Sequence, residues 1–198
     1  MSSAPERSTL PGDHAVTRGT FIAVVGPSGA GKDTLMNRAR RELTDRSDLF
    51  FVRRVITRPA DGATENHIPC TPEAFEQKLG NDGFAFHWDA HGLRYGLPIE
   101  IDERIAAGHR AVCNGSRAAL DGLSRHYANF RVIEITASAE VLANRLAARG
   151  RENPEDIRAR LERSAVLNAR WPGAMVIDNS GDIDTASRAL VEAILSHG

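Results

Sequence analysis

The sequence predicts an α/β fold in which a parallel sheet lies between two layers of helices. Short apolar runs alternate with helix-forming stretches along most of the 198 residues, which is the pattern of repeated strand–helix–strand units. The first apolar run, 21–25, leads directly into a glycine-rich turn and then into a helical stretch. Ligands bind to such sheets beyond the carboxyl ends of the strands, so we expect the functional site at that edge.

Turn and cap residues set the element boundaries in the first half of the chain. Thr71 and Pro72 have the residue types of a helix N-cap and a first helical position, and Gly80 ends that helix. Apolar residues on both sides of a turn at His91 and Gly92 predict a hairpin. The expected elements are a strand at 21–25, a helix at 33–45, an apolar segment at 49–56, a polar loop at 57–69, a helix at 72–80 and hairpin strands at 84–88 and 93–96.

The second half continues the alternation. Ser138 can cap a helix in which Val141, Leu142 and Leu146 share one apolar face. The expected elements are a helix at 98–108, a strand at 110–114, a helix at 118–127, a strand at 130–135, a helix at 138–149, another from 153, a strand at 174–177 and a helix at 183–195.

The composition is that of one soluble, enzyme-sized domain. Lys and Arg number 25 against 26 Asp and Glu, a net charge of -1, which argues against binding to nucleic acid. No apolar run is long enough to span a membrane. Residues 1–19 lack the apolar core of a signal peptide and are predicted to be a disordered tail before one domain at 20–198. Cys70 and Cys113 have no metal-ligand spacing and suit a reducing cytoplasm.

The glycine-rich turn after the first strand fits the phosphate-binding P-loop. Its residues are Gly26, Pro27, Ser28, Gly29, Ala30, Gly31 and Lys32. In this motif the glycines let backbone N–H groups face a phosphate, and the lysine reaches the outer phosphates. The following helix adds the positive end of its dipole. Because a strand and a helix flank the motif as it requires, we predict an ATP site at 26–34.

The residue after the lysine is Asp33, where most P-loops have a Ser or Thr that ligates Mg²⁺. Thr34 follows it. A carboxylate is a good ligand for a hard cation, so we expect Asp33 and Thr34 to hold Mg²⁺, with Thr34 also donating to a phosphate. The alternative is that Asp33 only complements the helix dipole.

Arginines crowd the stretch from the 138–149 helix into the next one. They are Arg145, Arg149, Arg151, Arg158, Arg160 and Arg163. Such a run is often a solvated helix face. Arginine also makes bidentate contacts with phosphate, so beside a P-loop we favour a lid at 149–163 that closes over a triphosphate.

A polar loop follows the second apolar segment, at the edge where ligands bind. It offers Arg58, Glu65, Asn66 and His67 together. This mixture suits a phosphorylated small molecule with several hydroxyl groups. We therefore expect residues 57–109 to form a small acceptor-binding lobe.

The order of these motifs resembles the guanylate kinase family over about residues 21–195. The shared features are the P-loop, the Thr57-Arg58-Pro59 loop, the Tyr95-Gly96 pair after an aromatic hairpin, and the arginine-rich segment. The resemblance implies a P-loop NTPase fold, a three-layer α/β/α arrangement with a five-stranded parallel core sheet, a small lobe and a lid. It also implies phosphate contacts by Lys32, Arg58, Tyr95, Arg145, Arg149 and Arg160.

The chain departs from guanylate kinases where those enzymes read guanine. His87 stands in place of a glutamate, and Asn114 and Ser116 stand in place of two acids. Asp61 also replaces a second arginine of the family. Carboxylates pair with the N–H donors of guanine, so their loss removes the means of reading the base.

The strings G-x-x-x-x-G-K-D, T-R-x(6)-E-N-H and N-G-S-R resemble instead the ribose 1,5-bisphosphate phosphokinases of the phosphonate-utilisation (carbon–phosphorus lyase) pathway. That resemblance implies ATP- and Mg²⁺-dependent transfer to the 1-phosphate of ribose 1,5-bisphosphate, giving 5-phosphoribosyl 1-diphosphate (PRPP) and ADP. Two alternatives stay open. One is a nucleoside monophosphate kinase of altered specificity, and the other is a non-catalytic guanylate-kinase-like interaction module.

The expected site residues fall into three groups on this interpretation. Arg58, Tyr95 and Arg117 would hold the acceptor. Lys32, Arg145, Arg149 and Arg160 would act on the transferring group. Candidates for the ribose hydroxyls are Glu65, Asn66, His67 and Asn114.

Overall fold

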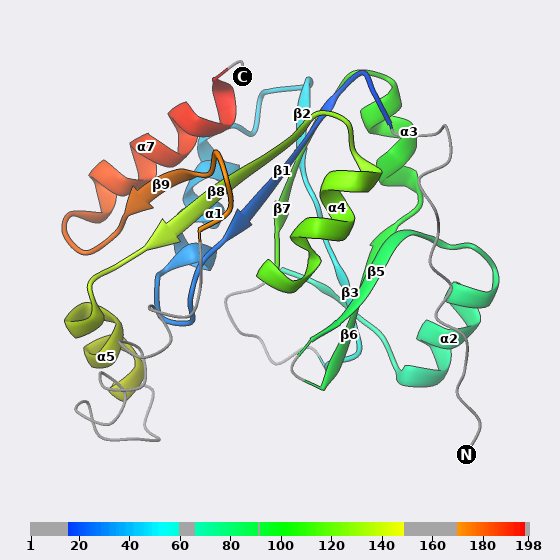
Figure 1. The fold of residues 1–198 in the computed structure, drawn as a ribbon, viewed down its shortest axis with the longest axis horizontal. Helices are drawn as coiled ribbons and strands as arrows, with labels where there is room; N and C mark the ends of the chain where they lie inside the picture. Colours follow the sequence, from blue (N-terminus) through cyan, green and yellow to red (C-terminus); the bar gives the residue numbers. More distant parts are fainter. Residues whose placement is uncertain (1–15, 60–65, 91, 149–169, 197–198) are drawn as a thin grey trace.

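A computed structural model describes residues 16–59, 66–90, 92–148 and 170–196 of the protein. Its core is an all-parallel sheet of five strands in the order β2-β7-β1-β8-β9 (Figure 1). The strands are β1 Thr20–Val25, β2 Leu49–Phe51, β7 Arg110–Asn114, β8 Phe130–Thr136 and β9 Met175–Asp178. The expected α/β fold with a five-stranded parallel sheet is confirmed.

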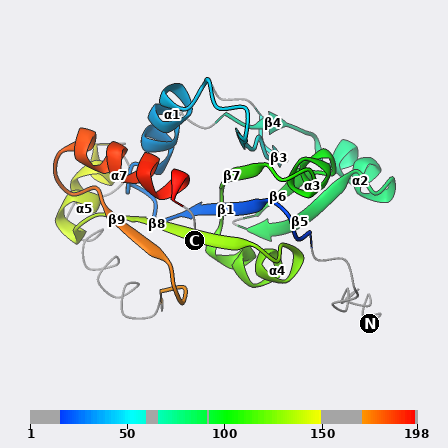
Figure 2. The ribbon, with the colours of Figure 1, turned by 90° about the horizontal axis from the view of Figure 1, so that it is seen from above.

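Helices cover both faces of this sheet. They are α1 Lys32–Glu42, α3 Glu100–Ala106, α4 Leu120–His126, α5 Ala139–Ala147 and α7 Ile183–Leu195. Ile22 and Val24 of β1 pack in one cluster with residues of α1 and α7. Phe21 and Ala23, which alternate with them, pack in a second cluster with residues of α3 and α4. Figure 2 shows α1 and α7 on one side of the sheet and α4 on the other, so both faces of β1 are buried.

A second sheet of four strands forms a small lobe beside the core. Its order is β4-β3-β6-β5, and it includes the expected hairpin, since β5 and β6 pair antiparallel. Helix α2 Pro72–Gly80 packs on it through Phe75 and Phe84, whose ring centroids are 4.5 Å apart. The strands are β3 Val55–Ile56, β4 Ile68–Pro69, β5 Phe84–Ala90 and β6 Leu93–Pro98.

The apolar segment 49–56 is divided between the two sheets, although its composition suggests one element. β2 ends at Phe51 in the core sheet, and β3 begins at Val55 in the small sheet. Arg53 and Arg54 lie between them. Arg54 is buried after the crossing, where its guanidinium packs against Trp88 and Tyr95 of the small sheet.

Two of the predicted helix caps are present, and one helix begins differently. The Thr71 hydroxyl accepts a hydrogen bond from the N–H of Ala74 at 3.2 Å. The Ser138 hydroxyl accepts one from Val141, also at 3.2 Å. The helix expected at 118–127 starts as a 3₁₀ turn, η1 Arg117–Ala119, before α4.

Two parts of the expected domain organisation, the N-terminal tail and the lid, fall largely on residues that the structure does not describe. The described chain begins at Val16, which forms an isolated bridge with Tyr127 ahead of the expected domain start at residue 20. The predicted lid, 149–163, lies outside the described residues. No described helix is both long enough and apolar enough to cross a membrane.

Candidate active site

The P-loop connects the carboxyl end of β1 to the start of α1, and its glycines are required by close backbone contacts. Gly31 has φ +84°, and a Cβ built there would lie 2.4 Å from Nδ2 of Asn179. A Cβ at Gly26 would lie 2.2 Å from the carbonyl oxygen of Ile135 on β8. Lys32 is the first residue of α1, directly after this turn. The loop therefore has the left-handed, tightly packed geometry that favours glycine.

Asn179 joins the P-loop to the far end of the chain. It follows β9, is 1% exposed, and donates from Nδ2 to the carbonyl oxygen of Ala30 at 2.7 Å. The backbone carbonyl oxygen of Asn179 accepts a hydrogen bond from Nη2 of Arg145 at 2.9 Å. Nη1 of Arg145 lies 3.4 Å from the carbonyl oxygen of Gly29. Arg145, predicted as part of the phosphate-binding arginine set, thus contacts the loop backbone from α5.

Asn179 belongs to none of the motifs that the sequence contains. The available signal is its position, because it follows a strand at the edge of the sheet where ligands bind. An asparagine there can bind a ligand or a loop equally well, and only the structure shows that it binds the loop.

We expect Asn179→Ala to destabilise the protein by about 1–3 kcal/mol, because it leaves the Ala30 carbonyl oxygen without this donor. It should also raise the KM for ATP more than the KM for the acceptor, since it loosens only the P-loop. Urea unfolding and steady-state kinetics measure the two effects. Asn144→Ala, at an exposed position on α5, is the control. Equal changes in both KM values would contradict a role confined to the loop.

Asp33 and Asn114 meet at the carboxyl edge of the core sheet. Asp33 lies in the first turn of α1, and its Oδ1 accepts from Nδ2 of Asn114 at 2.8 Å. Asn114 ends β7 and is 8% exposed. Its Oδ1 is buried and has no hydrogen-bond partner among the described residues. Two residues that the sequence assigned to the metal and to the acceptor are therefore in direct contact.

A pocket opens beside this pair, between α1, the crossing between the two sheets and the residues before β4. Asp33, Asn66 and Asn114 of the predicted set line it, and the other lining residues are Met36, Asn37, Arg40, Val52 and Arg54. Burial, followed by the charge of Arg53, lowers the pKa of Arg40 from its ordinary value. The pocket wall thus brings cationic side chains and amide groups to the P-loop helix.

Arg58 and His67 are brought together by the short β3 and β4 strands. Nη2 of Arg58 lies 3.5 Å from Nδ1 of His67, and Nε2 of His67 lies 3.4 Å from the carbonyl oxygen of Arg58. His67 is 7% exposed, and its own carbonyl oxygen accepts from Nη2 of Arg53 at 3.2 Å. The polar loop therefore contributes a connected pair rather than separate surface residues.

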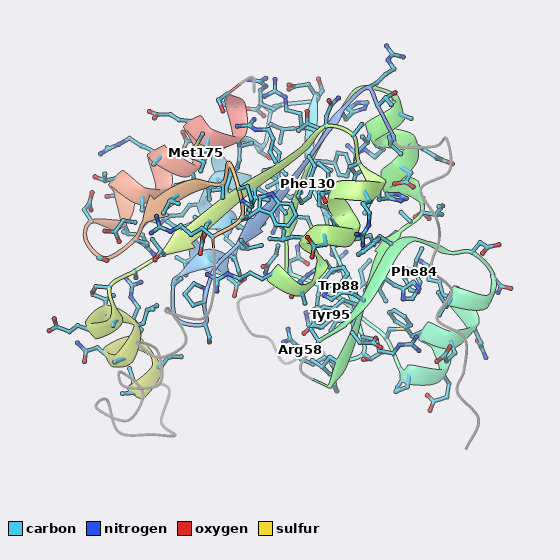
Figure 3. All side chains as sticks on the ribbon, viewed as in Figure 1. Arg58, Phe84, Trp88, Tyr95, Phe130 and Met175 are labelled. Carbon is cyan, nitrogen blue, oxygen red and sulfur yellow. The ribbon has the colours of Figure 1, made fainter. Side chains whose placement is uncertain are left out.

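Tyr95 is part of an aromatic stack in the small lobe. Its ring lies 5.2 Å from that of Trp88, at an interplanar angle of 9°. Arg54 lies against the stack, with its guanidinium carbon 5.0 Å from the Tyr95 centroid and 5.8 Å from the Trp88 centroid. Figure 3 shows Arg58 near these two rings, away from the helices α5 and α7. The small lobe thus gathers predicted acceptor residues at one place.

Arg117 is engaged by a buried acid. It begins η1 and forms an ion pair with Glu134 of β8, whose exposed fraction is 6%. Glu134 was not expected, because it lies inside an apolar run that predicts only a strand. A buried carboxylate requires a compensating cation, and Arg117 supplies it here. The predicted contact of Arg117 with the acceptor stays a prediction.

The remaining predicted site residues divide by location. Thr34 is exposed in the first turn of α1, next to Asp33. Glu65, Arg149 and Arg160 lie outside the described residues.

Comparison with known proteins gives close relatives. No protein-family model matches the sequence. The ribose 1,5-bisphosphate phosphokinase PhnN of Rhizobium etli is 46% identical over 174 residues, which cover 88% of this chain and 88% of that protein. The protein of the same name from Bradyrhizobium diazoefficiens is 45% identical over 180 residues, 91% of this chain and 90% of that one.

The crystal structure of guanylate kinase from Anaplasma phagocytophilum matches with a TM-score of 0.65 at 17% identity, over 89% of this chain and 85% of that one. At that identity the match establishes a guanylate-kinase-like fold. The sequence relatives are far closer, and they match over nearly the full length of both chains. The chain belongs to the ribose 1,5-bisphosphate phosphokinase family.

Proposed function

We propose that the protein transfers the γ-phosphoryl group of ATP to the 1-phosphate of ribose 1,5-bisphosphate, forming PRPP and ADP. The observation that carries this proposal is the pocket at the P-loop helix, in a chain that belongs to this family. Its described lining holds two arginines and three amide side chains but one carboxylate, Asp33, which suits a phosphorylated, hydroxyl-rich acceptor. A cytoplasmic location and the division into an acceptor lobe at 57–109 and a lid at 149–163 are part of the proposal.

The chemistry requires alignment and charge neutralisation. In the transfer, an oxygen of the acceptor 1-phosphate bonds to the γ-phosphorus while the bond from that phosphorus to the β–γ bridging oxygen breaks. The attacking oxygen is already ionised, so no side chain has to remove a proton. Lys32 and the loop N–H groups would hold the β- and γ-phosphates. Arg145, Arg149 and Arg160 would neutralise the charge of the transferring group.

Asp33 and Thr34 fit a Mg²⁺ ion. Both offer oxygen atoms in the first turn of α1, and the contact with Asn114 orients the Asp33 carboxylate. The ion would neutralise charge on the β- and γ-phosphates. Arg58 and Tyr95 would hold the acceptor from the small lobe, and Asn66, His67 and Asn114 would contact its hydroxyl groups. Arg117 and Glu65 complete the proposed acceptor set.

Phosphorus NMR of the protein with ATP, Mg²⁺ and ribose 1,5-bisphosphate tests this function directly. We expect a new pair of diphosphate resonances on the sugar, formed in equal amount with ADP. ADP formation without a sugar diphosphate would mean only ATP hydrolysis. If no sugar diphosphate forms and GMP is phosphorylated instead, the proposed function is wrong.

Asp33→Asn should raise the Mg²⁺ concentration for half-maximal rate while leaving ATP affinity at saturating Mg²⁺ little changed. Asparagine keeps an oxygen that can accept from Asn114, so the variant removes mainly the charge that would attract the ion. The rate is measured over a Mg²⁺ titration. Asp45→Asn, at an exposed position after α1, is the control. If the dependence of the rate on Mg²⁺ does not change, Asp33 does not hold the ion and only complements the helix dipole.

A further inference from the structure

The small lobe contacts the core at a glycine of α4, where an aromatic ring packs directly on the helix. A Cβ built at Gly122 would lie 2.4 Å from Cζ of Phe86 and 2.8 Å from its Cε2. Phe86 belongs to β5, the strand of the small lobe that runs beside α4 (Figure 2). Glycine destabilises the interior of a helix relative to alanine, so its presence there needs a reason. The reason is the Phe86 ring, which occupies the space that a larger side chain would need.

Ring contacts connect Phe86 to Tyr95. The ring centroids of Phe86 and Trp88 are 6.1 Å apart, and those of Trp88 and Tyr95 are 5.2 Å apart. Phe86 and Trp88 lie two positions apart on β5 and so share a face of the small sheet. Trp88 and Tyr95 are directly paired across β5 and β6. A displacement of the Phe86 ring would therefore reach Tyr95, which the proposed function assigns to the acceptor.

The end of α4 holds the same junction from the core side. The ring of His126 lies 6.3 Å from that of Phe86, centroid to centroid. Nε2 of His126 lies 2.9 Å from Oδ2 of Asp102, and the hydroxyl of Tyr127 donates to Oδ1 of Asp102 at 2.9 Å. Asp102 is on α3, the helix that follows β6. Both strands of the hairpin are therefore tied to α4, β5 by Phe86 and β6 through α3.

We propose that Gly122 and Phe86 are positioning residues for the acceptor. Their contact sets where the hairpin lies on the core, and so where Tyr95 meets the acceptor phosphate. The inference rests on the proposed function and adds two residues outside the set predicted from the sequence. The P-loop is built from β1 and α1 of the core, so its affinity for ATP should not depend on this contact.

Gly122→Ala tests the inference, because the added methyl group must displace the Phe86 ring. We expect the KM for ribose 1,5-bisphosphate to rise about 10-fold or more, since a small misplacement of binding groups is costly. The KM for ATP should stay as in the wild type. A smaller folded fraction would lower only kcat and leave both KM values unchanged, so steady-state kinetics separate positioning from stability.

A second substitution that makes room for the methyl group should restore acceptor use. Phe86→Leu alone should also raise the acceptor KM, and it decides the case if Gly122→Ala does not fold. The double variant Gly122→Ala/Phe86→Leu should have a lower acceptor KM than Gly122→Ala, because contacting residues are not additive. Gly80→Ala, in α2 of the same lobe, is the matched control, since a Cβ built there has open space among the described residues. It should change neither KM.

The fluorescence of Trp88 gives a readout that needs no turnover. Trp88 and Trp171 are the two tryptophans of the sequence, so Trp88 is the remaining one in a Trp171→Phe background. Trp171 packs edge-on against Phe130 of β8, away from the hairpin. Trp88 is 8% exposed, and its emission should move to longer wavelength when Gly122→Ala displaces the neighbouring ring and admits water. Gly80→Ala should leave the emission unchanged.

The possible outcomes separate this inference from the proposed function. An unchanged acceptor KM in both Gly122→Ala and Phe86→Leu would overturn the inference, and so would an equal rise in the KM for ATP. The same follows if the double variant is no better than Gly122→Ala, or if the Trp88 emission does not move. If the wild type does not use ribose 1,5-bisphosphate at all, the proposed function fails, and the assignment of Gly122 and Phe86 to the acceptor fails with it.

Discussion

Replacing Lys32 by alanine is expected to lower turnover by about 100-fold or more, with folding left intact. Lys32 begins α1 directly after the loop, so its amine is placed to neutralise charge on the phosphates during transfer. Alanine is the strongest helix former, so α1 should keep its first turn. ADP release at saturating substrates measures the turnover, and urea unfolding measures the stability.

Lys78 provides a matched control, since it is the only other lysine of the sequence. Its ammonium lies over the Phe84 ring, 5.5 Å from the centroid, in the small lobe. Lys78→Ala should therefore keep its turnover. Near-normal phosphoryl transfer by Lys32→Ala would reject the assignment of the P-loop, whatever the acceptor.

GMP is expected to be a poorer acceptor than ribose 1,5-bisphosphate by about 100-fold or more. The guanine base presents N–H donors, and where guanylate kinases place three carboxylates to accept from them this chain has His87, Asn114 and Ser116. Asp33, the carboxylate of the described lining, already accepts from Asn114. Each buried donor left unpaired costs about 1–3 kcal/mol, and guanine would bring more than one.

The measurement compares kcat/KM for the two acceptors by ADP release. Arg58→Ala should weaken use of ribose 1,5-bisphosphate while sparing ATP binding, since Arg58 lies in the small lobe beside His67. Arg117→Ala would change stability as well as acceptor use, because it also removes the ion-pair partner of the buried Glu134. Arg125→Ala is the exposed control. A higher kcat/KM for GMP, or unchanged acceptor use in Arg58→Ala, would contradict the proposed acceptor site.

Elements with strong local signals could be predicted from the sequence. The strand at 110–114 and the helix at 183–195 have the predicted bounds, and the Thr71 and Ser138 caps lie where their residue types indicate. In these places the information is contained in neighbouring residues, namely alternation of apolar positions, cap residues and glycines. The P-loop could be predicted for the same reason, since its strand, turn and helix follow one another directly in the sequence.

What could not be predicted depends on contacts between distant residues. Arg54 interrupts an apolar run of the sequence, and its position is explained only by its contact with the rings of Trp88 and Tyr95. Glu134 in a buried strand is explained only by its ion pair with Arg117. Neither partner is close in sequence, so no local pattern indicates the pairing. For the same reason the sequence did not predict that residues 55–56 form a strand of the small sheet, β3, which pairs with β6.

The contact between Asn179 and the P-loop has a consequence for the order in which the protein matures. The two bonded residues, Asn179 and Ala30, are 149 positions apart. During synthesis from the N-terminus, the phosphate-binding turn leaves the ribosome long before the strand that carries its support. Closing a loop of that length is a late, non-local event in folding. Nucleotide binding would therefore be gained only after β9 and Asn179 have been made, so that chains shortened before residue 179 carry the motif without the competence to use it.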